Sequence, residues 1–252
     1  MKKFFFAILL ITFNQFALAT DIPVIAAAAS VKFALQDIAK EFTQDTGKKV
    51  RISYSSSGNL TRQILQGGPF ELFLSANTHY IDQLHQQHKT VGQGVVYAIG
   101  RLVLLTHKDS NVQLDKNLAD VRQALQDGRL TRFAIANPVH APYGVAGKEV
   151  LNTLELWALS VPNLVLGENI AQAAQFTRSG AAQAGLISYS LALAPALKNH
   201  TRFLLLPADL HQPIQQSMVL LKNAGATSKL FFNYLQQDKA RNIFSAYGFS
   251  AP

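Results

Sequence analysis

The sequence predicts an α/β protein of two lobes, and three observations support this. Short apolar runs alternate with stretches of helical spacing in the first third of the chain, as in a parallel sheet covered by helices. A long apolar stretch, 95–106, interrupts the alternation, which then resumes. Further apolar runs and two helical stretches close the chain. We therefore expect a first lobe that is interrupted by a complete second lobe, forming a two-lobed clamp.

Three strand–helix pairs are expected in the first lobe. Residues 22–27 form an apolar run, and after Ser30 the apolar positions follow helical spacing until Gly47 ends the helix. Alternation and spacing predict the next elements in the same way. They are the strands 50–54 and 72–74 and the helices 60–65 and 78–88.

The second lobe is expected to begin within the stretch 95–106, interpreted as one strand that crosses between the lobes. The elements predicted after it are helix 117–126, strand 133–136, helix 145–156, strand 164–166, helix 170–178, strand 186–188, return strands 203–206 and 217–221, and helices 227–236 and 239–247. The predicted division is 20–98 for the first part of lobe 1, 99–206 for lobe 2 and 207–252 for the return to lobe 1.

Residues 1–19 are predicted to be a signal peptide. Lys2 and Lys3 form a basic start, residues 4–13 are apolar, and residues 17–19 form an A-x-A cleavage site. The apolar run is shorter than the roughly 20 residues that span a bilayer. Because no cysteine follows it, a lipid anchor is not expected. The prediction is a free protein that is exported to the periplasm.

Composition narrows the class of protein further. The chain contains no cysteine, which excludes disulfides, thiolate metal sites and a cysteine nucleophile. Its formal charge of +8 falls by two when Lys2 and Lys3 are removed with the signal peptide. No run of lysine and arginine exceeds two residues, so nucleic acid is not an expected partner. The positive charge instead indicates a field that attracts anions.

Small and hydroxyl-bearing residues stand where predicted strands pass into predicted helices. In parallel sheets, ligands bind at these junctions, where free N–H groups of helix N-termini point outward. A single such junction is usually an ordinary helix cap. Two such junctions in each predicted lobe, none of which contains arginine or lysine, favour the binding of an anion that is held by hydrogen bonds. The junction residues are Ser30, Ser57–Gly58, Tyr143–Gly144 and Asn169–Ile170.

Around these junctions the sequence resembles a known family. The stretches that carry the resemblance are 27–30 (AAAS), 54–64, 68–76, 136–144, 167–170 and 247–249, and together they extend over essentially the whole mature chain. They are similar to the periplasmic molybdate-binding proteins of ABC importers. The resemblance implies a type II periplasmic binding-protein fold and a monomeric subunit that delivers molybdate or tungstate to a membrane permease, without catalysis or a cofactor.

The resemblance also implies which residues bind the oxyanion. It assigns the hydroxyl and N–H of Ser30 and Ser57, together with the backbone N–H groups of Tyr143 and Ile170, to the ligand.

One further donor differs from the common family pattern. Many members have a tyrosine three residues after the glycine that matches Gly185, where this chain has Ser188 followed by Tyr189. A variant subgroup places a tyrosine between proline and glycine instead, as in Pro142-Tyr143-Gly144 here. Tyr143 is therefore expected to donate through both its N–H and its phenol. Strand alternation allows at most one of Ser188 and Tyr189 to reach the ligand.

Several alternative functions remain open from the sequence. Another tetrahedral oxyanion, sulfate or phosphate, suits the same donors, and the residues do not separate molybdate from tungstate. A periplasmic hydrolase using Ser57 is disfavoured because no G-x-S-x-G motif is present. His79, His85 and His88 lack the i, i+4 spacing of a zinc pair, so no cation site is expected. His140 is interpreted as a residue at the rim of the site.

Overall fold

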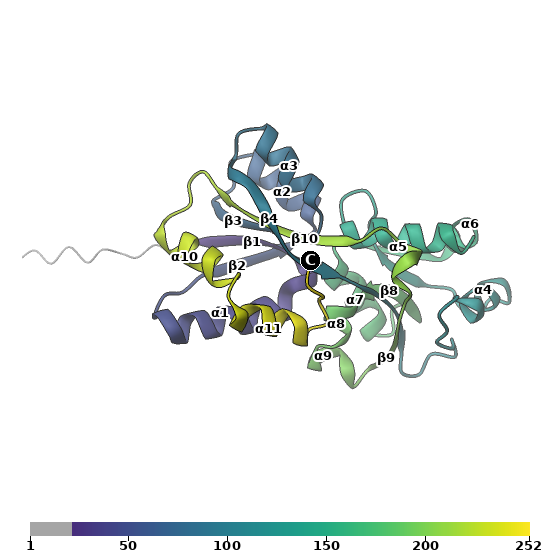
Figure 1. Ribbon diagram of the computed structural model, residues 1–252. Coiled ribbons are helices and arrows are strands. Elements are labelled where there is room, and N and C mark those ends of the chain that lie inside the picture. Colours follow the sequence, from purple (N-terminus) through teal and green to yellow (C-terminus); the bar gives the residue numbers. More distant parts are fainter. Residues whose placement is uncertain (1–21) are drawn as a thin grey trace, which may run out of the picture.

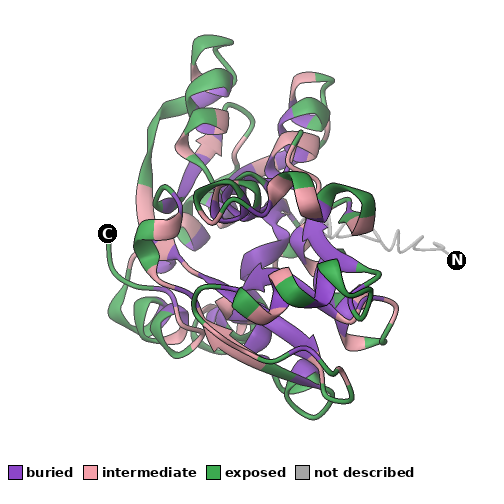
Figure 2. Ribbon diagram, turned by 90° about the vertical axis from the view of Figure 1, so that its right-hand side faces the viewer, coloured by how far each residue is buried: buried purple, intermediate pink, exposed green. Residues whose placement is uncertain are grey.

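The computed structural model describes residues 22–252, so the predicted signal peptide lies outside the described residues. Two five-stranded sheets, each flanked by helices, form two lobes that lie side by side (Figure 1). Strands form the buried interior of each lobe, and the outer faces of the helices are exposed (Figure 2). The predicted two-lobed α/β fold is therefore confirmed.

The first lobe has the strand order β2-β1-β3-β10-β4. Its strands are β1 (Val24–Ala28), β2 (Arg51–Ser55), β3 (Phe70–Ser75), β4 (Thr90–Gly100) and β10 (Ile214–Leu221). Its helices are the 3-10 turn η1 (Ala29–Val31), α1 (Lys32–Thr46), α2 (Ser57–Leu65), α3 (Thr78–Gln86), α10 (Ala226–Tyr234) and α11 (Asp238–Ala246).

The second lobe has the strand order β7-β6-β8-β5-β9. Its strands are β5 (Leu102–His107), β6 (Phe133–Ala136), β7 (Leu164–Gly167), β8 (Ala184–Ser188) and β9 (Thr201–Leu205). Its helices are α4 (Ala119–Gln126), α5 (Pro142–Thr153), α6 (Trp157–Ser160), η2 (Val161–Asn163), α7 (Ile170–Arg178), α8 (Tyr189–Ala192) and α9 (Pro195–Lys198), and η3 (Ala208–Leu210) lies in the connection to β10.

Strand directions are equivalent in the two sheets. β1 runs parallel to β2 and β3, while β10 runs antiparallel to β3 and β4. In the second sheet β6 runs parallel to β7 and β8, while β5 runs antiparallel to β8 and β9. Four strands of each sheet therefore point one way, and the reversed strand is the one that enters from the other lobe.

The stretch 95–106 is not the single crossing strand that the sequence predicted. β4 ends at Gly100 and β5 begins at Leu102, because β4 pairs with β10 in one sheet and β5 pairs with β8 and β9 in the other. The chain changes lobe at Arg101. β9 stays in the second sheet, within the predicted bounds of lobe 2, and β10 returns to the first.

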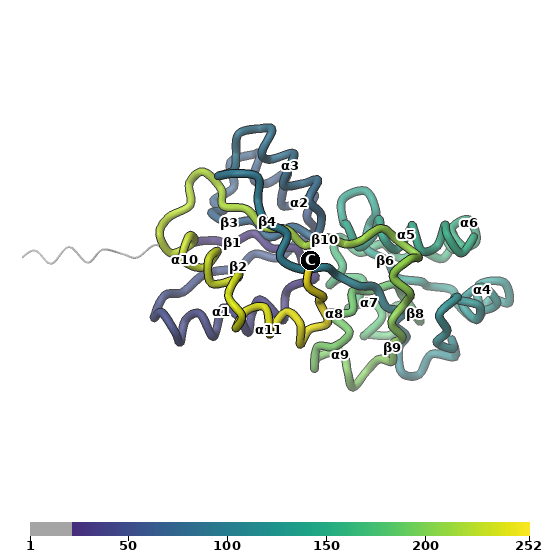
Figure 3. The backbone as a smooth tube through the Cα atoms, in the orientation of Figure 1, coloured from purple at the N-terminus to yellow at the C-terminus, as the bar shows by residue number. Residues whose placement is uncertain are grey.

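The two connections between the lobes are hydrogen-bonded to each other. The Arg101 guanidinium donates to the carbonyl of Leu206 over 2.9 Å, and the N–H of Leu206 donates to the carbonyl of Leu102 over 3.1 Å. Beside them, Ile99 and Ser250 exchange backbone hydrogen bonds of 2.8 and 3.1 Å. Figure 3 shows β4, β10 and the C-terminus meeting in the middle of the molecule, between the two lobes.

Helices α2 and α5 begin three residues earlier than predicted. α5 begins at Pro142, whose fixed φ suits the first helical turn and whose missing N–H costs nothing there. α2 begins at Ser57, preceded by Ser56 in an extended conformation. The earlier starts place Ser57 and Tyr143 within the first turns, where N–H groups have no partner inside the helix.

Small residues let the two lobes approach closely. Ala28, Ala29 and Ala76, at the carboxyl ends of β1 and β3, belong to the same buried cluster as Tyr143 and Ile170 of the second lobe. Because alanine side chains end at Cβ, the carboxyl ends of the first sheet come into contact with the helix starts of the second lobe.

Candidate functional site

A small cavity lies where the carboxyl ends of the two sheets meet. Its volume is about 10 Å³, which is close to the space that a single water molecule occupies. The residues that line it come from both lobes and carry no charge: Ala28, Ala29, Ser30, Ser55, Ser56, Ala76, Ala141, Pro142, Tyr143, Asn169 and Ile170. Three of the four predicted ligand residues, Ser30, Tyr143 and Ile170, are therefore brought together here.

Ser57, the fourth, is fully buried in the first turn of α2 but does not line this cavity. Its hydroxyl oxygen accepts the N–H of Ala76 over 3.0 Å, and both Ala76 and the preceding residue Ser56 line the cavity. Because the hydroxyl accepts this bond, its own proton is left for another acceptor.

The N-terminus of α7 is arranged to leave one N–H for the cavity. The side chain of Asn169 accepts the N–H groups of Ala171 and Gln172 at 3.0 and 3.1 Å. This cap leaves out Ile170, the first helical residue, which lines the cavity and is 3% exposed. The cap thus occupies the N–H groups of the second and third helical residues. The N–H of Ile170, at the positive end of the helix dipole, is left for the site.

Tyr143 contributes a phenol as well as an N–H group. The side chain is 2% exposed, and burial raises the pKa of the phenol, an effect that the nearby Ser30 hydroxyl opposes. A raised pKa keeps the phenol protonated over the whole physiological range, so it remains a hydrogen-bond donor. The site therefore combines hydroxyl donors, N–H donors and helix N-termini, which together stabilise negative charge.

Ser188 and Tyr189 are not among the residues that line the cavity. Ser188 is fully buried, and its hydroxyl accepts that of Ser190 over 3.2 Å. The ring of Tyr189 packs on Phe203 with centroids 5.8 Å apart, and a Cβ placed on Gly248 would lie 2.5 Å from it. Tyr189 is thereby directed toward β9 and the C-terminal turn.

His140 forms a bridge between the lobes that the sequence did not predict. Its Nδ1 lies 2.9 Å from the Ser56 hydroxyl, and its carbonyl accepts the N–H of Gly58 over 2.9 Å. Its Nε2 lies 3.5 Å from Glu168, which also accepts the side-chain amide of Asn59 over 3.4 Å. Ser56, Gly58 and Asn59 belong to the first lobe, so these contacts, the His140 latch, hold the two lobes together.

The latch brings together a serine, a histidine and a glutamate, as in hydrolytic triads. Ser56 is only 3% exposed, and the pair of His140 and Glu168 is separated by 3.5 Å with a mostly exposed carboxylate. In triads the carboxylate is buried and hydrogen-bonded to the imidazole. The contacts of Ser56, His140 and Glu168 therefore fit a link between the lobes, and not a catalytic triad.

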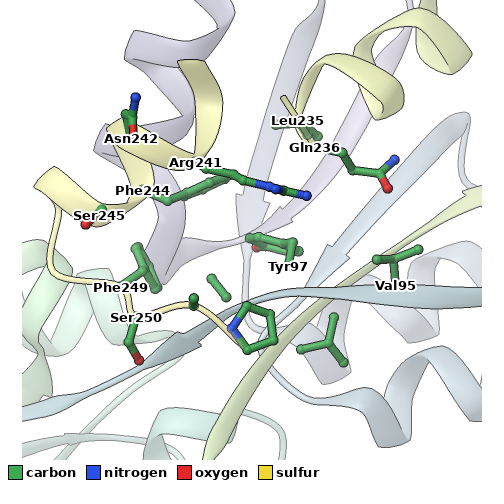
Figure 4. A pocket seen from close by; sticks show the side chains of 14 residues that line it. Val95, Tyr97, Leu235, Gln236, Arg241, Asn242, Phe244, Ser245, Phe249 and Ser250 are labelled. Atoms are coloured by element: carbon green, nitrogen blue, oxygen red, sulfur yellow. The ribbon is translucent and has the colours of Figure 1, made fainter. Parts of the chain in front are cut away.

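A roomier cavity of about 400 Å³ lies within the first lobe (Figure 4). Its lining comes from β4, α11 and the C-terminal segment, and it includes the rings of Tyr97 and Phe244, which are tilted by 40° with centroids 5.0 Å apart. None of the predicted ligand residues lines it, and it does not lie between the lobes.

Neither a metal-binding cluster nor a membrane-spanning helix is found within residues 22–252. No group of three histidine, aspartate or glutamate side chains there is placed to hold a metal ion. His85 instead lies 3.0 Å from the Thr90 hydroxyl. No helix in the same part of the chain is long and apolar enough to cross a membrane.

The sequence pattern of the family described as bacterial extracellular solute-binding proteins matches residues 23–250. The chain belongs to this family. Among such solute-binding proteins, the molybdate-binding protein of Azotobacter vinelandii is 34% identical over 228 residues, 89% of this chain and 88% of that protein. The molybdate-binding protein of Escherichia coli K12 is 31% identical over 229 residues, covering 89% and 87%.

Solved structures of solute-binding proteins agree with this assignment. The periplasmic molybdate-binding protein of Azotobacter vinelandii superposes with a TM-score of 0.83 and 31% identity, over 91% of this chain and 99% of that one. The sulfate-binding protein of Mycobacterium tuberculosis shares the fold, with a TM-score of 0.74 and 14% identity over 91% and 86%. The predicted resemblance to periplasmic molybdate-binding proteins and the predicted type II fold are confirmed.

Proposed function

We propose that this protein is the periplasmic substrate-binding subunit of an ABC importer and that its ligand is molybdate or tungstate. The observation that carries the proposal is the small uncharged cavity, to which both lobes contribute donors. The names of the similar proteins from Azotobacter vinelandii and Escherichia coli support the same ligand. In this proposal Ser30, Ser57, Tyr143 and Ile170 bind the oxyanion, and the protein has no catalytic role.

A tetrahedral dianion suits this cavity for physical reasons. Donors arriving from several helices can reach every face of a tetrahedron, and the helix dipoles add positive potential without a full charge. A site without arginine or lysine leaves no buried cation unpaired after release. A pocket of this size admits a ligand only when the lobes move apart, and a compact oxyanion requires less movement than a sugar or an amino acid.

Export to the periplasm, monomeric state and a membrane permease as partner belong to the same proposal. The predicted signal peptide at residues 1–19 supports export. The matched relatives are named as binding proteins, which work by handing a solute to a transporter, and this supports the permease as partner.

Calorimetric titration with molybdate, tungstate, sulfate and phosphate tests the proposed ligand. Molybdate and tungstate are expected to bind, and a thousandfold excess over Kd should stabilise the fold by about 4 kcal/mol, measured as a rise in melting temperature. Phosphate is expected to bind poorly, because near neutral pH it keeps a proton and the cavity lining offers no carboxylate to accept it. Sulfate is expected to bind more weakly than molybdate. Equal binding of the two would contradict the proposed ligand and leave a general oxyanion binder.

The alternative function as a serine hydrolase is tested by an esterase assay on the wild type and Ser57→Ala. Within residues 22–252, the hydrogen bond formed by the Ser57 hydroxyl is the one it accepts from Ala76, and His140 contacts Ser56 instead. We therefore expect no esterase activity in either protein. Activity that disappears with Ser57→Ala would overturn the binding role.

His140→Ala is expected to raise the Kd for molybdate about 3- to 10-fold, mainly through faster dissociation. The substitution removes the contacts of the imidazole with Ser56 and Glu168, which belong to the closed arrangement and each contribute about 1 kcal/mol or less. Stopped-flow dissociation measures the effect. Val139→Ala is the control, since Val139 is adjacent and 84% exposed. An unchanged dissociation rate in His140→Ala would rule out the latch.

A further inference from the structure

Gln216 is a fully buried polar residue that the proposed ligand set does not include. It lies in β10, the strand that returns to the first lobe, and its side chain is 0% exposed. Its neighbour Gln215 points to the opposite face and is exposed. A buried amide requires hydrogen-bond partners, since leaving one unsatisfied costs about 1–3 kcal/mol. The hydrogen-bond partners of Gln216 therefore indicate the role of its buried side-chain amide.

Both partners are hydroxyls of the proposed oxyanion site. The side-chain Nε2 of Gln216 donates to the phenol oxygen of Tyr143 over 3.4 Å. Its Oε1 accepts the hydroxyl of Ser30 over 3.3 Å. Ser30 belongs to the first lobe and Tyr143 to the second, so one amide is linked to donors from both sides of the cavity.

The phenol of Tyr143 has little freedom to leave this arrangement. A Cβ placed on Gly100 would lie 2.1 Å from the Tyr143 hydroxyl and 3.0 Å from Nε2 of Gln216. The hydroxyl therefore rests against the bare backbone of β4, beside the amide. Only a glycine at position 100 leaves room for it.

The donors and acceptors around the site give this amide a role. A fully ionised oxyanion only accepts hydrogen bonds, so each hydroxyl around it must direct its proton toward it. When the phenol oxygen receives the N–H of Gln216, its own proton is free for the oxyanion. We propose that Gln216 is a positioning residue that does not touch the ligand: its Nε2 holds the Tyr143 hydroxyl with the phenol proton free for the oxyanion, and its Oε1 accepts the Ser30 proton until the oxyanion takes that proton instead. This inference rests on the proposed oxyanion-binding function.

The test is a mutant cycle on the mature chain, with the Kd for molybdate measured by calorimetry. Gln216→Met keeps the size of the side chain and removes both polar atoms, and we expect it to raise Kd about 10-fold. In protein that already carries Ser30→Ala and Tyr143→Phe, the same substitution is expected to change Kd less than twofold. Gln215→Met, on the exposed face of the same strand, should leave Kd unchanged.

One further variant and the wild-type affinity separate the outcomes. Gln216→Glu keeps the shape but loses the N–H and brings a carboxylate near the anion, so it should weaken binding at least as much as Gln216→Met. An equal factor in both backgrounds, or no loss in the wild-type background, overturns the positioning role. Failure of the wild type to bind molybdate overturns the proposed function and this inference with it, whereas tight wild-type binding unaffected by Gln216→Met overturns the inference alone.

Discussion

Gly144→Ala is expected to abolish measurable oxyanion binding and to lower the melting temperature by about 5–12 °C. A Cβ at this position would lie 2.2 Å from the carbonyl oxygen of Ala136, 2.7 Å from its carbon and 2.8 Å from the carbonyl carbon of Asn137. All three atoms are backbone, so no side-chain rotation relieves the overlap. The start of α5 must move away from the end of β6.

That movement also displaces Tyr143, the residue immediately before Gly144 in the first turn of α5. Its N–H and its phenol are both assigned to the ligand, and small displacements of such donors weaken hydrogen bonds steeply. Thermal melting and calorimetric titration with molybdate measure the two effects.

Gly147→Ala is the matched control, because Gly147 lies one turn further along the same helix. The nearest atoms to a Cβ there belong to Leu186 and Ile135, at 3.7 and 3.8 Å, which is ordinary van der Waals contact. Alanine is favoured over glycine inside helices by about 1 kcal/mol, so the melting temperature should stay equal or rise slightly. Wild-type affinity in Gly144→Ala would contradict the packing argument.

Local periodicity predicted most of the elements and three residues that line the small cavity between the lobes. Helical spacing and strand alternation depend only on neighbouring residues, and they placed Ser30, Tyr143 and Ile170 at strand-to-helix junctions. Because parallel strands present their carboxyl ends at one edge, the junctions of each lobe had to lie together. Where the two lobes meet, residues that are more than a hundred positions apart in the sequence line one cavity.

Features that depend on distant pairing were not predicted. The break at Arg101 follows from β4 and β5 joining different sheets, which the apolar stretch itself does not reveal. Gln216 and His140 have no distinctive local pattern. The side-chain hydrogen bonds by which they reach the other elements join residues that are 73 or more positions apart in the chain.

Alternation along one strand was also the wrong physical argument for Tyr189. β8 ends at Ser188, and Tyr189 begins α8, so the two residues do not share a strand. The side chain of Tyr189 is placed instead by its packing on Phe203 and Gly248.

Tyr143→Phe is expected to raise the Kd for molybdate roughly 10- to 150-fold. Loss of a hydrogen bond to a charged group costs about 1.5–3 kcal/mol, and the substitution removes only the hydroxyl while the backbone N–H remains. It also leaves Nε2 of Gln216 without the phenol oxygen as its acceptor. Because burial raises the pKa of the Tyr143 phenol, the wild-type donor stays protonated, and the ratio of the two Kd values should be constant between pH 6 and about pH 9.

Two variants make this prediction decisive. Tyr189→Phe is expected to leave Kd unchanged, since its ring lies against Phe203 rather than at the cavity. Ser57→Ala should weaken binding whichever tyrosine supplies the phenol, because its hydroxyl is assigned to the ligand in either arrangement. If Tyr189→Phe weakens binding while Tyr143→Phe does not, Tyr189 is the phenolic donor and Tyr143 contributes its backbone alone. The structure would then have to rotate α8 so that this side chain leaves Phe203 and enters the cleft when the ligand binds.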